Sequence, residues 1–343
     1  MNRLRWSLLL VAVALPVAAP PSGAATVKTM ASRLNVPWGL AFLPGDDALV
    51  SERSTGRILR VPRRGGTPKQ VMKVTGLDPA GIEGGLLGLA VSPAYKSDHL
   101  VYAFVTTATD NRIVRFPLGG TVQPIVTGIS RGRFHDGGRL GFGPDGKLYA
   151  SVGDATRGSN AQDLGSRNGK ILRMNPDGTP PPDNPFPSSL VWSLGHRNVQ
   201  GFAWDGSKRL WATEFGDKRY DEVNLIQPGA NYGWPTVEGP GDTHGGTFTN
   251  PALTWSPTSS ASPSGAAVVG SNLYVAALQC ECLFRIPIHG ATLGKPHKLF
   301  AERFRRIRTV ARAPDGSLWM TTTNRDGREL PSKTDDRVLR VRF

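Results

Sequence analysis

The sequence has few cysteines, few acidic residues and no long apolar run beyond its first residues. With only 2 Cys among 343 residues, it is not a small scaffold held together by disulfides. After the N-terminal segment, no stretch approaches the roughly 20 apolar residues that span a bilayer. Segments with strong helical periodicity are also missing, which excludes a coiled coil. We therefore expect a core built from strands and turns.

The shortage of acidic residues leaves 41 Lys and Arg against 27 Asp and Glu, a formal net charge of +14. A nucleic-acid-binding surface needs its positive charges clustered in a stripe or patch. Here they are dispersed over strand ends and turns, with no basic run interleaved with aromatic residues. We therefore expect no nucleic-acid partner, and we interpret the excess as a solvated surface that favours anionic partners.

Residues 1–25 have the three parts of a secretory signal peptide. Arg3 and Arg5 form the positive region, a short apolar region follows, and small residues lead to a cleavage site near Ala24 or Ala25. The apolar region is too short to cross a bilayer. We therefore predict export to the periplasm or the medium, no stable membrane insertion, and a single mature domain at 26–343.

A pattern of about 53 residues recurs six times along the rest of the chain. Each copy begins with a Gly or small residue and an apolar strand, followed by a turn that often contains Asp-Gly, a second apolar strand, and a strand that often carries Arg. The copies occupy 37–61, 85–116, 138–174, 199–226, 263–286 and 307–343. Asp-Gly turns between apolar strands are typical of β-hairpins.

Small antiparallel sheets of this kind bury their faces by stacking around an axis. We therefore predict an all-β fold: a six-bladed β-propeller of four-stranded antiparallel blades. The strand expected at 26–34 would pair into the last blade and close the ring. A two-domain β-sandwich protein explains the regular repeat less well.

Two short motifs match signatures of other enzyme classes but lack the required context. Residues 141–146 fit G-x-G-x-x-G, and residues 128–132 fit G-x-S-x-G. Dinucleotide binding and a nucleophile elbow both need a helix directly after the motif. The first motif contains a Pro-Asp-Gly hairpin turn and no helix is expected after the second, so we discard both.

Polar residues that interrupt the strand pattern are the best candidates for a site, because loops from all blades converge at one end of a propeller. His135 lies in a Gly-rich segment ahead of the third copy, and an imidazole can serve as a general base near neutral pH. Asp154 follows a strand of the same copy and could orient His135. The alternative is that His135 only caps a turn.

Three further polar clusters precede or follow predicted strands. Residues 195–198 read Gly-His-Arg-Asn, and residues 214–222 combine glycine-flanked carbonyls with carboxylates, which suit calcium. Arg306 and Arg308 share one face of a strand, an arrangement that favours a ligand with several carboxylates. Each cluster could instead be a solvated or salt-bridged turn.

Cys280 and Cys282 are two residues apart and are expected on one strand, where they would share a face. A disulfide at this spacing and two free thiols are both consistent with the sequence. A metal site would need further ligands that no nearby His or Cys supplies.

Nine strings along the chain resemble the soluble PQQ-dependent aldose sugar dehydrogenases, which are related to the soluble quinoprotein glucose dehydrogenases. They run in the family's order over essentially the whole predicted mature chain. The strings are PWGLAF (37–42), EGGLLG (83–88), HDGGRL (135–140), GPDGKLY (143–149), GKILR (169–173), GHRN (195–198), DEVNLI (221–226), ANYGWP (230–235) and RIR (306–308). The fold implied by the resemblance is also a six-bladed propeller.

The resemblance implies a sugar dehydrogenase with PQQ and Ca²⁺ as cofactors. His135 would take the proton of the anomeric hydroxyl of an aldose while hydride passes to PQQ, Asp154 would orient His135, and Arg197 would stabilise charge on the quinone. The product would be a lactone, and the electrons would pass to an external acceptor. The remaining implied contacts are Glu83 to the sugar, Asn198, Arg306, Arg308 and Gln279 to PQQ, the carbonyls of Gly216 and Asp217 to calcium, and Glu222 and Tyr232 to a second, structural calcium.

Two positions depart from the family pattern. The family usually has Lys where Gln279 stands, so one positive partner of a cofactor carboxylate is missing, and Pro is common where Asp217 stands. Gln279 favours one alternative, an exported propeller that has lost PQQ and is not an enzyme. Another alternative is a calcium-dependent propeller hydrolase of lactones or esters, which would need calcium held by side chains in the central channel. The sequence favours no particular oligomeric state.

Overall fold

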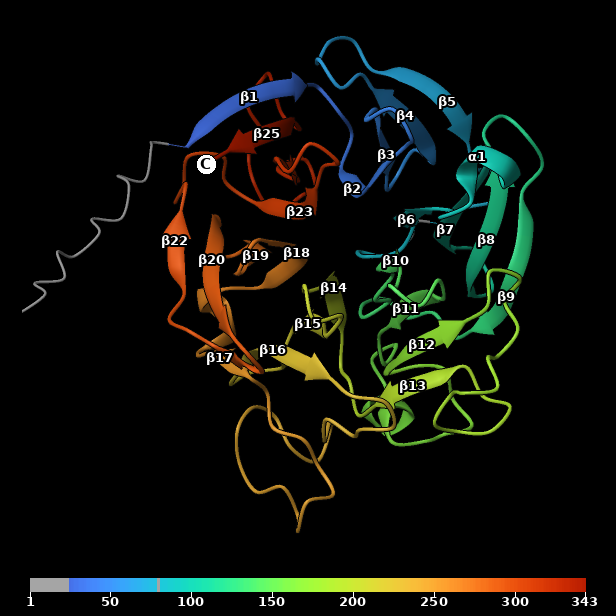
Figure 1. The fold of residues 1–343 in the computed structure, drawn as a ribbon, viewed down its shortest axis with the longest axis vertical. Coiled ribbons are helices and arrows are strands. Elements are labelled where there is room, and N and C mark those ends of the chain that lie inside the picture. Colours follow the sequence, from blue (N-terminus) through green and yellow to red (C-terminus); the bar gives the residue numbers. More distant parts are fainter. Residues whose placement is uncertain (1–24, 79–80) are drawn as a thin grey trace, which may run out of the picture.

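The computed structural model describes residues 25–78 and 81–343 and forms a ring of six antiparallel sheets around a central channel (Figure 1). The predicted six-bladed propeller is therefore confirmed. The expected signal peptide lies, apart from Ala25, outside the described residues. Across the described residues, no helix is long and apolar enough to span a membrane.

Each blade begins with an inner strand beside the channel and continues outwards. The first three blades are β2–β5, β6–β9 and β10–β13. Their strands are β2 (Pro37–Phe42), β3 (Ala48–Glu52), β4 (Arg57–Val61), β5 (Lys69–Lys73), β6 (Leu86–Val91), β7 (Leu100–Thr106), β8 (Asn111–Pro117), β9 (Gln123–Ile129), β10 (Leu140–Phe142), β11 (Leu148–Val152), β12 (Lys170–Met174) and β13 (Val191–Leu194).

The last three blades are β14–β17, β18–β22 and β23–β25 with β1. Their strands are β14 (Val199–Trp204), β15 (Leu210–Glu214), β16 (Asp221–Ile226), β17 (Leu253–Trp255), β18 (Pro263–Val269), β19 (Asn272–Ala277), β20 (Cys282–His289), β21 (Thr292–Leu293), β22 (His297–Leu299), β23 (Ile307–Arg312), β24 (Leu318–Thr322), β25 (Val338–Arg342) and β1 (Thr26–Ala31). One short helix, α1 (Tyr95–Asp98), and two 3₁₀ turns, Gly158–Ala161 and Thr258–Ser260, complete the described elements.

The N-terminal strand closes the ring as predicted. β1 pairs with β25 in antiparallel register, with Val27 opposite Val341. The first strand of the described chain thus becomes the outermost strand of the last blade (Figure 1). This pairing fixes both ends of the described chain to one sheet, so the six repeats form a closed ring.

Five of the six inner strands, all except β23, contain a glycine that allows neighbouring blades to approach at the channel. A Cβ on Gly39 of β2 would lie 2.7 Å from the carbonyl oxygen of Leu87, and one on Gly88 of β6 would lie 2.3 Å from that of Gly138. The Gly88 N–H donates to this same Gly138 oxygen at 3.0 Å. Any larger residue would push the inner strands apart, which explains why the repeats carry glycine here.

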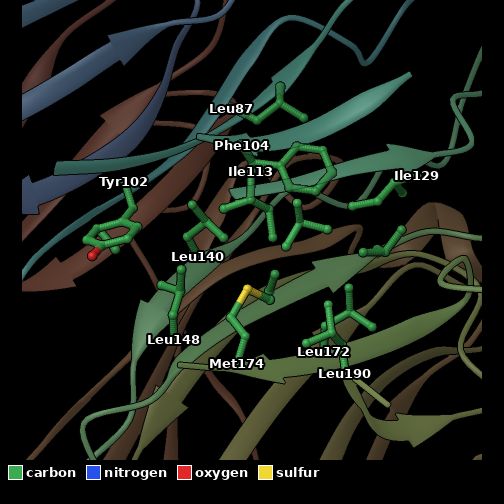
Figure 2. Close-up of a cluster of buried hydrophobic side chains, with 14 of the residues drawn as sticks. Leu87, Tyr102, Phe104, Ile113, Ile129, Leu140, Leu148, Leu172, Met174 and Leu190 are labelled. Carbon is green, nitrogen blue, oxygen red and sulfur yellow. The ribbon is translucent and has the colours of Figure 1, made fainter. Parts of the chain in front are cut away.

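Apolar side chains between adjacent blades form the core. Figure 2 shows the cluster between the second and third blades, where Phe104 and Ile113 face Leu140 and Met174. All four side chains are buried. Removing such a side chain typically costs about 2–5 kcal/mol, so each blade interface holds its two sheets in a fixed relative position. The loops at the ends of the inner strands are therefore attached to sheets whose relative positions are fixed.

Candidate active site

The predicted catalytic residues converge at the end of the channel where the inner strands begin, which we call the upper end. His135 precedes β10, Asp154 follows β11, and Arg197 precedes β14. A cavity of about 260 Å³ lies between them. Its lining includes Glu83, His135, Arg197, Asn198, Gln279 and Arg306. Six residues from distant parts of the sequence thus surround one space.

His135 and Asp154 form the hydrogen-bonded pair expected of a base and its orienting carboxylate. The His135 Nδ1 lies 2.7 Å from Asp154 Oδ1, and Asp154 is only 1% exposed. Asp154 also accepts from the Thr156 N–H at 2.7 Å and from the Trp234 Nε1–H at 2.9 Å. With the carboxylate fixed by these donors, Nδ1 carries the proton and Nε2 is the free basic nitrogen.

Glu83, which precedes the second blade, links His135 of the third blade to Asn198 of the fourth. Its Oε2 accepts from the His135 backbone N–H at 2.9 Å and from Asn198 Nδ2 at 3.1 Å. The Asn198 Oδ1 accepts from the Gly137 N–H at 3.1 Å and from Gln200 Nε2 at 3.0 Å. Asn198 therefore positions its neighbours through Oδ1 and one of its two Nδ2–H groups, and Glu83 reaches the cavity beside His135.

Arg197 presents its guanidinium across the cavity from His135. Nη2 donates to Asp217 Oδ1 at 3.1 Å, and the guanidinium carbon lies 5.4 Å from the centre of the Trp234 ring. The Nε of Arg197 is enclosed, and no described residue accepts from it. An enclosed guanidinium nitrogen without an acceptor is costly, so this position suits an anionic or carbonyl-bearing ligand.

Arg306 and Arg308 extend the positive charge down the channel. Arg306 pairs with Asp326 at 3.0 Å, and both side chains are at least 95% buried. Arg308 donates only to neutral groups, Gln200 Oε1 at 3.1 Å and Ser264 Oγ at 3.3 Å, and its Nε is enclosed without an acceptor. Burial lowers the pKa of Arg308 to about 9. Among the described residues, no carboxylate forms a salt bridge with Arg308.

Gly216 and Asp217, the expected calcium ligands, lie on the connection after β15. The Glu238 carboxylate holds this connection by accepting four consecutive backbone N–H groups, the first from Asp217 at 2.8 Å. No described residue donates to the carbonyl oxygens of Gly216 or Asp217, so both are available. Among residues 25–78 and 81–343, however, no group of three or more His, Cys, Asp or Glu is arranged to hold a metal.

Glu222, assigned to a second calcium, is buried beside Glu214. Asn224 Nδ2 bridges them, at 2.9 Å from Glu222 and 3.4 Å from Glu214, while its Oδ1 is enclosed without a partner. Burial, and then the Glu214 charge, raise the pKa of Glu222 to about 8. Tyr232 lies nearby but uses its hydroxyl to donate to the Leu225 carbonyl at 2.6 Å, which leaves only its backbone oxygen for a cation.

Gln279 lines the cavity beside a disulfide. Cys280 and Cys282 are bonded, with Cα atoms 5.2 Å apart. The expectation that both lie on one strand is wrong, because Cys280 is in the turn before β20 and Glu281 turns the chain with φ of +51°. The turn brings the two side chains together, which settles the open question of their state in favour of the disulfide.

A family model described as "Glucose / Sorbosone dehydrogenase" matches residues 34–331 of the chain. The chain belongs to this family. The match covers five blades and the two inner strands of the sixth, without β1 and β25, and it includes every residue of the site described above.

The chain is similar to one solved structure and to two curated sequences with sugar dehydrogenase names. The PQQ-bound aldose sugar dehydrogenase of Streptomyces coelicolor is 48% identical over 94% of this chain and 99% of its own, with a TM-score of 0.87. An aldose sugar dehydrogenase of Escherichia coli is 28% identical over 89% of this chain and 91% of its own. Quinoprotein glucose dehydrogenase B of Acinetobacter calcoaceticus is 33% identical over 65% of this chain and 55% of its own.

Three charged residues near the cavity were missed by the sequence reasoning. Asp326 pairs with Arg306, Arg328 lines the cavity, and Arg53 lies close enough to both Asp326 and Glu83 to interact electrostatically. Burial lowers the pKa of Arg53. Arg53 directly follows the second strand of the first copy, the position that Phe215 holds in the fourth. Because Phe215 lines the cavity, this shared position was a usable signal. Asp326 and Arg328 lie in a connection with no repeated pattern.

Proposed function

We propose that this protein oxidises the anomeric hydroxyl of an aldose to a lactone, with PQQ as the bound oxidant and calcium as its partner. The observation that carries the proposal is the His135–Asp154 pair at 2.7 Å, whose histidine lines a cavity together with Arg197, Arg306 and Arg328. The membership of the family and the PQQ-bound relative at 48% identity support the choice of reaction.

The donor set of the cavity fits PQQ, a planar quinone with several carboxylates. Arg197, Arg306 and Arg328 line the cavity, and the enclosed Nε of Arg197 has no acceptor among the described residues. Arg308 does not line the cavity but lies close enough to Arg306 and Glu83 to interact electrostatically. Guanidinium groups bind carboxylates through paired hydrogen bonds, so these side chains would hold the cofactor. Asn198 lines the cavity as well and would position it. When bound, PQQ supplies a two-electron acceptor for the hydride that leaves C1 of the sugar.

The protein's own residues would activate the sugar hydroxyl. Asp154 keeps the proton of His135 on Nδ1, so Nε2 can accept the proton of the anomeric hydroxyl. Glu83, held against the His135 N–H, would bind a neighbouring sugar hydroxyl and align C1 with the cofactor. Arg197 would stabilise negative charge on the group bound opposite the histidine.

Calcium has oxygen ligands at the expected place but no cluster of acidic side chains. The free carbonyls of Gly216 and Asp217 would supply two ligands, and the Asp217 carboxylate, now paired with Arg197, lies on the same connection. The cofactor would have to supply others, so binding of calcium and PQQ should be interdependent. The positive charge of a second ion near Glu222 and the Tyr232 carbonyl would be balanced by the buried carboxylates of Glu222 and Glu214.

Export, the external electron acceptor and the substrate class belong to the same proposal. The first 25 residues have the features of a signal peptide, and an exported quinoprotein must pass its electrons to an acceptor outside the cytoplasm. A propeller hydrolase would need calcium held by side chains in the central channel, and the described residues include no group of three or more His, Cys, Asp or Glu that could hold a metal. A propeller that has lost its cofactor would not need a cavity lined by three arginines, one of which has an enclosed Nε without an acceptor among the described residues.

Reconstitution of the purified protein tests this function. We expect dye reduction with one or more aldoses only when both PQQ and calcium are added. His135→Gln should abolish dye reduction while PQQ still binds, and His297→Gln, an exposed histidine on β22, should behave like the wild type. Failure of PQQ to bind, or of any aldose to reduce the dye, would contradict the proposal.

A further inference from the structure

A second cavity, of about 290 Å³, occupies the opposite end of the channel, where the inner strands finish. All six inner strands, which surround the centre in Figure 1, contribute to its lining, and it shares no lining residue with the upper cavity. The walls are mainly apolar: Leu40, Leu89, Leu140, Phe202, Trp204 and Val268. This lower cavity is therefore a separate compartment that the proposed dehydrogenase reaction does not use.

Arg139 also lines the lower cavity and is only 7% exposed. Its Nε donates to the Gln200 carbonyl at 2.9 Å and its Nη2 to Thr309 Oγ1 at 3.2 Å, while its guanidinium carbon lies 4.2 Å from the centre of the Trp38 ring. No described residue accepts from Nη1, and this nitrogen is not enclosed by protein atoms.

No carboxylate among the described residues pairs with Arg139. Its partners are a carbonyl, a hydroxyl and an aromatic ring, and burial without a compensating charge lowers its pKa to about 9. Buried charges in proteins are normally paired, because removing an ion from water is costly. Arg139 therefore lacks a compensating negative charge, and its Nη1 is free to pair with one.

We propose that the lower cavity binds a small monocarboxylate with a short apolar body, whose carboxylate pairs with Arg139. One cationic group at the base selects a single negative charge, and the leucine and aromatic walls select an apolar body over a sugar or a phosphate ester. The exposed Arg312 at the mouth of the cavity would attract the anion. The upper cavity differs, because it combines several arginines with carboxylates and a histidine.

Calorimetric titration of the full protein with benzoate, and with neutral benzamide as the matched ligand, tests the proposal. We expect saturable one-to-one binding of benzoate, at least tenfold weaker binding of benzamide, and the same benzoate affinity with or without PQQ. Arg139→Met should weaken benzoate at least tenfold. Arg60→Met, which removes an exposed arginine of β4, should leave its affinity unchanged.

A crystal of the wild type soaked with 4-bromobenzoate gives a second readout that needs no variant. The anomalous bromine signal should lie in the lower cavity, with the carboxylate on Arg139 Nη1. A bromine signal found only elsewhere, an absence of saturable benzoate binding, or undiminished binding by Arg139→Met would overturn the proposal. If Arg139→Met does not fold, the bromine position decides.

Discussion

Replacing Asp154 with Asn separates the orienting role of the carboxylate from the presence of His135 itself. In the wild type, Oδ1 accepts from His135 Nδ1 and the Thr156 N–H, both at 2.7 Å, while Oδ2 accepts from Trp234 Nε1 at 2.9 Å. The single side-chain oxygen of an asparagine can replace either Oδ1 or Oδ2, but not both. Its amide NH₂ then faces either the indole N–H or the two donors on the histidine side.

The magnitude follows from the hydrogen bonds that are lost. A hydrogen bond to a charged group contributes about 1.5–3 kcal/mol, and each 1.36 kcal/mol changes a rate tenfold. Asp154→Asn should therefore lower kcat by about 10- to 100-fold, because the imidazole loses both its tautomer preference and its stabilising charge. KM and the affinity for PQQ should change little, since Asp154 does not line the cavity.

The assay is steady-state dye reduction by the PQQ-loaded variant, with PQQ affinity and unfolding free energy measured on the same preparation. Asp163→Asn is the matched control, because Asp163 lies on the same connection but is exposed. Among the described residues, its side chain accepts a hydrogen bond only from the Gly165 N–H. If folded, PQQ-loaded Asp154→Asn kept kcat within about threefold of the control, Asp154 would not orient the base.

Three further changes test other parts of the account. Gln279→Lys should tighten PQQ roughly 2- to 5-fold in an absorbance titration by adding an exposed charge pair; unchanged affinity would place Gln279 away from the cofactor carboxylates. Lys170→Met should lower the unfolding free energy in urea by about 2–4 kcal/mol, because Nζ donates to the carbonyls of Asn160, Ala161 and Asn168 at 2.6–3.0 Å; a loss below about 1 kcal/mol would refute this. Burial raises the pKa of Asp336 to about 6, so ionisation costs the folded state stability as pH rises from about 4 to 6. Asp336→Asn should remove this loss, so that between pH 4 and pH 7 its unfolding free energy rises by on the order of 2 kcal/mol relative to the wild type. If the urea midpoint of the variant differed from that of the wild type by the same amount at both pH values, this prediction would be contradicted.

The repeats made the fold predictable because each copy carries the physical requirements of a blade. A glycine where inner strands meet recurs in five copies and an Asp-Gly hairpin turn in three, while two apolar strands recur in all six, and the three inner strands of each blade follow from them. The outer strands were less visible. β5, for example, reads Lys-Gln-Val-Met-Lys and is buried on one side only, at Met72, so its apolar signal is weak.

The site was predictable where its residues lie in compact motifs and not where it is assembled across the ring. His135, Arg197 and Asn198 each interrupt a strand pattern at a loop, and the resemblance gave them roles. Asp326 and Arg53 come from the sixth and first blades, and their proximity depends on the ring closure made by β1 and β25. Only the closed propeller brings these two residues to the same cavity.

The measurement that tests the central claim most directly is a single turnover. The PQQ- and calcium-loaded protein is mixed with excess aldose in the absence of any external acceptor, and the lactone is quantified. The account predicts one lactone formed per bound PQQ and none without PQQ or with His135→Gln. Lactone formed equally without PQQ, or no lactone from a fully loaded protein with any aldose, would contradict it.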